Sequence, residues 1–85
     1  MYTPAIRNFS GPKSHQVTCP DGTILYFSYE TLIGFIPRNS GQVIALRNYW
    51  AQTTGGHLNE IEPDKDKRLT NEEFEIALKK YFEKA

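Results

Sequence analysis

The sequence predicts an α+β fold, in which a small antiparallel sheet of three to four strands packs against a C-terminal amphipathic helix. β-Branched and aromatic residues are concentrated between positions 15 and 50, turn-forming clusters interrupt them, and apolar residues follow a helical period near the C-terminus. With 85 residues, the chain is expected to form a single domain. We expect its parts to be an extended arm over 1–14, the sheet over 15–50, a short helix or turn over 51–62 and the C-terminal helix over 70–84.

The arm and the sheet are distinguished by their turn-forming residues. Proline and glycine among small polar residues predict an extended arm, and regular structure is expected to begin near His15. The letters CPDGT at 19–23 predict a hairpin, because proline presets φ, aspartate bonds the local backbone and glycine accepts a positive φ. A second cluster at 37–41 separates TILYFSYETLIGFI from the strand QVIALRN, and a break or bulge is expected near Glu30 or Gly34.

Both faces of the predicted sheet are apolar. Ile24 and Tyr26 point to one face, whereas Leu25 and Phe27 point to the other, and the strand QVIALRN repeats this pattern. One helix can cover only one face. The second face therefore needs the arm, the middle segment or a partner protein, and self-association as a homodimer is a further prediction.

The C-terminal helix is predicted from an apolar stripe at helical spacing. Glu75 and Lys79 add a favourable pair four residues apart on the remaining surface. The stripe consists of Phe74, Ala77, Leu78, Tyr81 and Phe82.

The stretch EPDKDKRLTNEE at 62–73 has two interpretations. It can be laid over a calcium-binding loop, with Glu62 at the first position and Glu73 at the twelfth. However, Lys67 stands where the loop needs glycine. Thr70 and Glu73 instead fit a capping box at the start of the C-terminal helix, which is the interpretation we favour. We therefore expect no metal site and no cofactor.

Composition favours a soluble protein of the reducing cytoplasm. Ten basic and ten acidic side chains balance, Cys19 is the only cysteine, and no apolar run is long enough to cross a membrane. His57, near Thr54 and Asn59, has no evident nucleophile beside it, so we predict that the protein is not an enzyme. Thr53 or Thr54 could instead cap a short helix, where the following glycine pair would leave amides open to an anion.

The combination of FSY at 27–29, Trp50, TT at 53–54 and HLN at 57–59 resembles a family of small uncharacterised proteins of bacteriophages and bacteria. This resemblance implies no assigned activity. It implies a small phage-type protein that binds a host or viral protein, and inhibitors of host defence such as anti-CRISPR proteins belong to that class.

Three functions therefore stay open. The first is protein binding, with inhibition of a host defence machine. The second is an accessory role on nucleic acid, with arginines and aromatic side chains as contacts. The third is binding of a small ligand or ion by the Thr-Thr-Gly-Gly segment or the acidic stretch. The candidate binding residues are Tyr29, Arg38, Arg47, Trp50, Thr54, His57 and Asn59.

Overall fold

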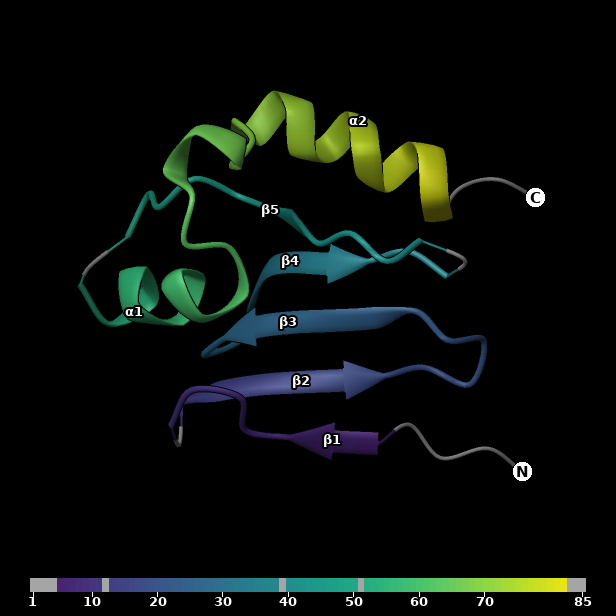
Figure 1. Cartoon of the computed structure of the whole chain (residues 1–85), viewed down its shortest axis with the longest axis horizontal. Helices are drawn as coiled ribbons and strands as arrows, with labels where there is room; N and C mark the ends of the chain where they lie inside the picture. The colour runs from purple at the N-terminus through teal and green to yellow at the C-terminus, as the bar shows by residue number, and fades with distance from the viewer. Residues whose placement is uncertain (1–4, 12, 39, 51, 83–85) are drawn as a thin grey trace.

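The structure is a computed structural model that describes residues 5–11, 13–38, 40–50 and 52–82. Within these ranges five strands form one antiparallel sheet in the order β1-β2-β3-β4-β5, and two α-helices pack on it (Figure 1). A short 3-10 helix, η1, precedes the second helix. The elements are β1 (Ala5–Arg7), β2 (Ser14–Thr18), β3 (Ile24–Ser28), β4 (Thr31–Ile36), β5 (Ile44–Ala45), α1 (Gln52–Ile61), η1 (Lys65–Lys67) and α2 (Asn71–Phe82).

The α+β class is confirmed, but the predicted number of strands is wrong, since the described residues hold five strands rather than three to four. The additional strand is β1, which lies in the segment predicted as an extended arm. It pairs with β2, with Ile6 opposite Val17 and Arg7 opposite Gln16. Three residues are too few to show the alternation by which the longer strands were found.

The first predicted turn is confirmed in detail. The Asp21 carboxylate accepts a hydrogen bond from the amide of Thr23 at 2.9 Å, and Gly22 has a φ of 97°. The amide of Cys19 donates to the carbonyl of Thr23, which closes the hairpin between β2 and β3. The backbone bond holds the pKa of Asp21 below its ordinary value, because it stabilises the charged carboxylate.

The predicted irregularity in the long strand run is a shift in register between β3 and β4. Tyr26 is opposite Gly34, whereas the next residue, Phe27, is opposite Leu32. Ile33 is therefore the extra residue of a bulge. Ile33 and Phe35, two residues apart, consequently belong to different core clusters.

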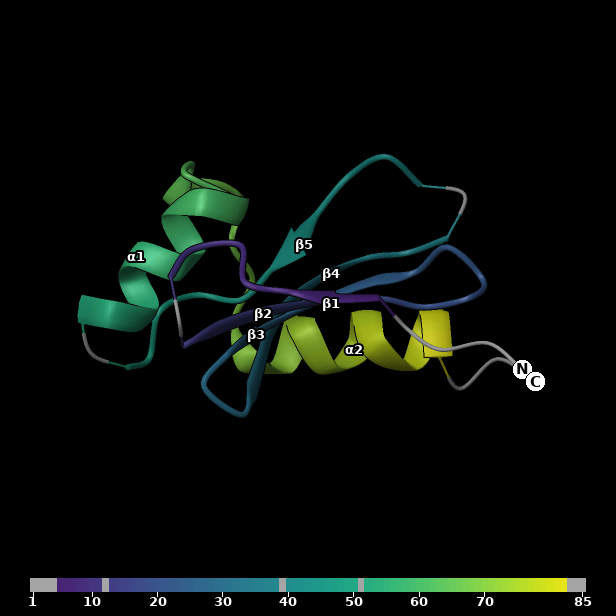
Figure 2. The same ribbon diagram turned by 90° about the horizontal axis from the view of Figure 1, so that it is seen from below.

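The two helices cover opposite faces of the sheet (Figure 2). On one face, Phe74 of α2 packs with the buried Phe35 and Leu46. On the other face, Leu58 of α1 packs with the buried Ile33 and Ala45, joined by Phe9 from the loop after β1. The middle segment, through Leu58, and the arm, through Phe9, thus cover the sheet face for which the sequence analysis predicted no single covering element. The need for a partner on that face, which motivated the homodimer prediction, is correspondingly reduced.

Helix α2 begins at the predicted capping box. The Thr70 hydroxyl accepts from the amide of Glu73 at 3.2 Å, and the Glu73 carboxylate accepts from the amide of Thr70 at 2.9 Å. The preceding acidic stretch forms η1, where the Asp64 carboxylate accepts from the amide of Asp66. The Phe82 side chain, the last of the predicted stripe, lies outside the described side chains. No helix in the described part of the chain is long and apolar enough to cross a membrane.

Candidate functional site

A buried polar network joins the end of β3 to α1. The Ser28 hydroxyl lies 2.9 Å from the Thr54 hydroxyl and 2.7 Å from Nδ1 of His57. The three side chains are 2%, 5% and 4% exposed, respectively. Hydrogen bonds can run from Thr54 through Ser28 to the ring, in which case each hydroxyl donates one bond. In the reverse direction the ring donates to Ser28 and Ser28 donates to Thr54. The network therefore fastens α1 to the sheet through three mutually satisfied polar groups.

The pairing of serine and histidine does not give this network a nucleophile. A serine that attacks a substrate must reach it, and the Ser28 side chain is enclosed between β3 and α1. Within the described residues no buried side-chain nitrogen or oxygen lacks a hydrogen-bond partner. Nε2 of His57 has no partner there, so this nitrogen must reach the surface. The network is thus a structural support for the exposed residues that lie next to it.

Tyr29 is the exposed residue next to this support. It is in the two-residue turn between β3 and β4, with a φ of 57°, and its side chain is 49% exposed. Its ring lies 6.3 Å from the ring of His57, which contacts Phe9 at 6.0 Å on edge. The Tyr29 amide donates to the carbonyl of Lys13 at 2.7 Å. A bulky residue at positive φ is strained, and such strain is often found at functional sites.

Two further exposed aromatic residues precede α1. The rings of Tyr49 and Trp50 meet edge to face at 6.1 Å, and both are exposed. The Tyr49 hydroxyl accepts from the amide of Asn71 at 3.2 Å, and the Asn48 side chain accepts from the amide of Trp50 at 2.9 Å. The segment 46–50 and the β3–β4 turn lie at the same end of the sheet as α1 (Figure 1). We call Tyr29, Tyr49 and Trp50 the aromatic surface.

A pocket of about 420 Å³ lies between α1 and η1 and is lined by three basic side chains and by the acidic Asp66. Arg47, Lys65 and Arg68 line it together with Asn48 and Asn59. Arg68 is buried, donating to the carbonyl of Glu62 and to the Asn59 side chain at 2.9 Å. Asn59 therefore orients an arginine. The sequence did not single out Arg68, because its partner in the helix lies nine positions away.

Arg38 is not part of either arrangement. It follows β4, whose C-terminal end lies at the opposite end of the sheet from α1 (Figure 1). Its charge acts on Asp21. The structure therefore does not bring Arg38 together with Arg47 and Trp50.

The expected cap of α1 is wrong. The helix begins at Gln52, so Thr53 and Thr54 lie within its first turn rather than in front of it. Gly55 and Gly56 are likewise inside the helix instead of forming an open turn. Thr54 belongs to the buried network. A Cβ on Gly55 would lie 2.9 Å from the side-chain nitrogen Nδ2 of Asn48, so a side chain at position 55 would contact the Asn48 side chain.

A family model matches residues 1–76, which include the whole network and the aromatic surface. The chain belongs to the Family of unknown function (DUF8033). The prediction of an uncharacterised family is thereby confirmed. Comparison of this DUF8033 chain with curated proteins and with solved structures found no match.

Three of the letters that carried the resemblance, Ser28, Thr54 and His57, meet in the buried network of this DUF8033 protein. Tyr29 lies beside His57, whereas Asn59 accepts from Arg68 instead. Ser28 and Tyr29 come from the FSY stretch, Thr54 from the threonine pair, and His57 and Asn59 from the HLN stretch. The sequence marked Thr54 and His57 separately, and nothing in the local pattern joined them to Ser28. A buried serine in an apolar strand was the available signal, because such a hydroxyl requires a partner.

Proposed function

We propose that this protein acts by binding another protein through the aromatic surface at the α1 end of the sheet. The observation that carries this proposal is Tyr29, a half-exposed tyrosine at positive φ above a buried hydrogen-bond network. Exposed tyrosine and tryptophan side chains are the types that contribute most binding energy at protein interfaces. The buried network next to Tyr29 is a rigid support, which reduces the entropy that this residue loses on binding.

The finer proposal is that the protein is a small phage-type inhibitor that binds a host defence machine in the bacterial cytoplasm. It is supported by the resemblance of the stretches at 27–29, 53–54 and 57–59 to small phage and bacterial proteins. A protein that blocks by binding needs a preformed surface rather than a reactive group. The network and the aromatic surface are such an arrangement.

The test is affinity capture from bacterial lysate with wild type and three variants, followed by mass spectrometry. Tyr29→Asn and Trp50→Ala alter the aromatic surface, whereas Ile76→Ala removes an exposed apolar side chain on α2. We expect the same protein to be captured by wild type and by Ile76→Ala, and to be lost with both aromatic variants. Capture that is equal in all four would refute the proposed surface.

A protein partner of the defence class is tested in cells. Expression of the wild-type chain should restore plating of a phage that the host defence otherwise restricts, and Trp50→Ala should not. If the captured protein has no defence role and plating is unchanged, the finer proposal is wrong while the binding surface stands.

The second candidate, an accessory role on nucleic acid, is favoured by one observation. Arg47, Lys65 and Arg68 line one pocket together with Asp66. Arg47 also lies two and three positions before the exposed Tyr49 and Trp50, and arginine near aromatic rings suits single strands. Salt-dependent binding of a fluorescent oligonucleotide that is weakened by Arg47→Met would support it. Arg38→Met, at the opposite end of the sheet, is the matched control.

A further inference from the structure

A row of side chains crosses the sheet on the α1 face. The register places Arg7 opposite Gln16, Gln16 opposite Tyr26, Tyr26 opposite Gly34 and Gly34 opposite Ala45. Directly opposed residues in neighbouring strands point to the same face. The row thus changes from polar at the β1 edge to small and apolar at β5.

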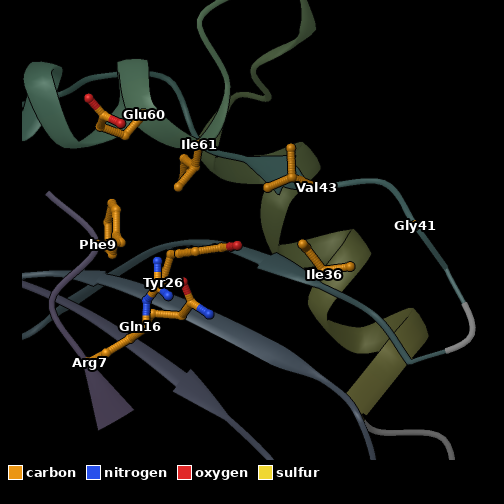
Figure 3. A pocket seen from close by; sticks show the side chains of 9 residues that line it. All are labelled: Arg7, Phe9, Gln16, Tyr26, Ile36, Gly41, Val43, Glu60 and Ile61. Atoms are coloured by element: carbon orange, nitrogen blue, oxygen red, sulfur yellow. The ribbon is translucent and has the colours of Figure 1, made fainter.

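Helix α1 covers only the apolar end of this row. A Cβ at Gly34 would lie 2.8 Å from Cδ1 of Ile61 and 3.1 Å from the carbonyl oxygen of Ile44, so the glycine lets the helix end approach the sheet closely. The polar end is left open and forms a pocket of about 360 Å³ (Figure 3). Phe9, Ile61 and Val43 supply its apolar walls.

The polar groups on the floor of this pocket are unoccupied by the rest of the fold. Among the residues that the structure describes, no hydrogen bond or ion pair engages the side chains of Arg7, Gln16 or Tyr26. In Figure 3 these three side chains lie together, and the Tyr26 hydroxyl points along the pocket toward Ile36 and Val43. Burial raises the pKa of Tyr26, and the nearby Arg7 charge opposes this, so Tyr26 stays a neutral hydrogen-bond donor beside a cation.

We propose that this pocket binds a small amphipathic carboxylate, with its carboxylate at Arg7 and Gln16 and its apolar part along the Tyr26 ring between Phe9 and Ile61. Arginine suits a carboxylate because its planar fork can donate two parallel hydrogen bonds. The single cation and the Glu60 carboxylate at the rim select a monoanion over a more highly charged group. The pocket volume lies at the lower end of the range for small-ligand sites, so it limits the size of the ligand to a compact molecule.

The experiment is a titration of the ¹⁵N-labelled protein with hexanoate, followed by amide chemical shifts. Hexanol and hexylamine are the matched probes, with the same chain and a neutral or positive head. We expect saturable shifts at the pocket residues for hexanoate, about tenfold weaker binding of hexanol and none of hexylamine. Binding of hexylamine as tight as that of hexanoate, or no saturable shift with hexanoate, overturns the proposal.

Variants separate the pocket from general anion binding. Arg7→Met keeps the apolar stem and removes the charge, and should weaken hexanoate binding about tenfold. Tyr26→Phe keeps the ring against Phe9 and removes only a hydroxyl that points away from Arg7, so it should change hexanoate binding much less than Arg7→Met does. Arg47→Met, at the other pocket, should bind as wild type does. Equal hexanoate affinity of wild type and Arg7→Met overturns the proposal, which is independent of any partner at the aromatic surface.

Discussion

Ser28 is the residue on which two others depend. Its hydroxyl is the hydrogen-bond partner of both Thr54 and His57, and all three are buried. Ser28→Ala would leave Thr54 and Nδ1 of His57 without partners in a site closed to water. We expect it to lower the free energy of unfolding by about 1–3 kcal/mol, the cost of an unsatisfied buried polar group.

The measurement is urea unfolding followed by circular dichroism. Thr53→Ala is the matched control, because this neighbouring threonine of α1 is exposed and should change stability by less than about 0.5 kcal/mol. A loss in Ser28→Ala no larger than that in Thr53→Ala would contradict a stabilising network.

A substitution at Tyr29 shows whether the positive φ of this residue of the aromatic surface lowers the stability of the fold. Its φ of 57° favours asparagine over a bulky side chain. Tyr29→Asn should therefore raise the free energy of unfolding by roughly 0.5–1 kcal/mol, a fraction of the cost of a left-handed residue. The thermal midpoint should rise correspondingly. A clearly lower midpoint would mean that the ring contact with His57 outweighs the strain, and that Tyr29 is a structural residue.

Sequence reasoning reached individual residues of the site but not their association. Thr54 and His57 were candidates because threonine and histidine near a glycine pair are visible locally. Their bonds to Ser28 span 26 and 29 positions, and no periodicity encodes such a separation. Tyr29 was a candidate through the resemblance, whereas its positive φ follows from a two-residue turn that the sequence does not signal with glycine or asparagine.

At the scale of elements, the start of α2 was predictable because a capping box is a local motif of only four residues. The bonds between Thr70 and Glu73 lower the pKa of the Glu73 carboxylate below its ordinary value. A lowered pKa in the folded state means that the charged carboxylate favours folding. This contribution is complete above the ordinary glutamate pKa and is lost as the pH falls through the lowered value.

Glu73→Gln should therefore lower stability more at about pH 7 than at about pH 3, which lies below the ordinary glutamate pKa, because part of the contribution of the charged carboxylate is lost there. Urea midpoints of both proteins at the two pH values give the comparison. Glu72→Gln is the control, because this exposed carboxylate lies on the same first turn but outside the capping box. A difference between wild type and Glu73→Gln that is independent of pH would show that the charge is not involved.

Strand β1 and the first residue of α1 were not predictable in the same way. β1 has three residues and exists through its pairing with β2, so its signal is tertiary. Helix α1 begins at Gln52, earlier than the expected threonine cap, and it contains two glycines that weaken any helical propensity. Burial of Leu58 and Ile61 against the sheet outweighs that propensity.

At the scale of the whole molecule, strand β4 joins the two cores. Ile33 and Gly34 face α1, while Phe35, the next residue, packs on α2 and meets the Phe74 ring edge to face at 5.6 Å. Loss of either layer should release β4, so the protein should unfold in one transition.

Trp50 and the helices report on this coupling independently. Trp50 is the only tryptophan and precedes α1, whereas far-ultraviolet circular dichroism follows both helices. Phe74→Ala, on the α2 face, should lower the free energy of unfolding by about 3–5 kcal/mol. It should also move the Trp50 fluorescence midpoint and the dichroism midpoint equally, although Trp50 is not part of the α2 core. A fluorescence midpoint that stays at the wild-type value while the dichroism midpoint falls would show that the α1 layer, with its aromatic surface, is stable without α2.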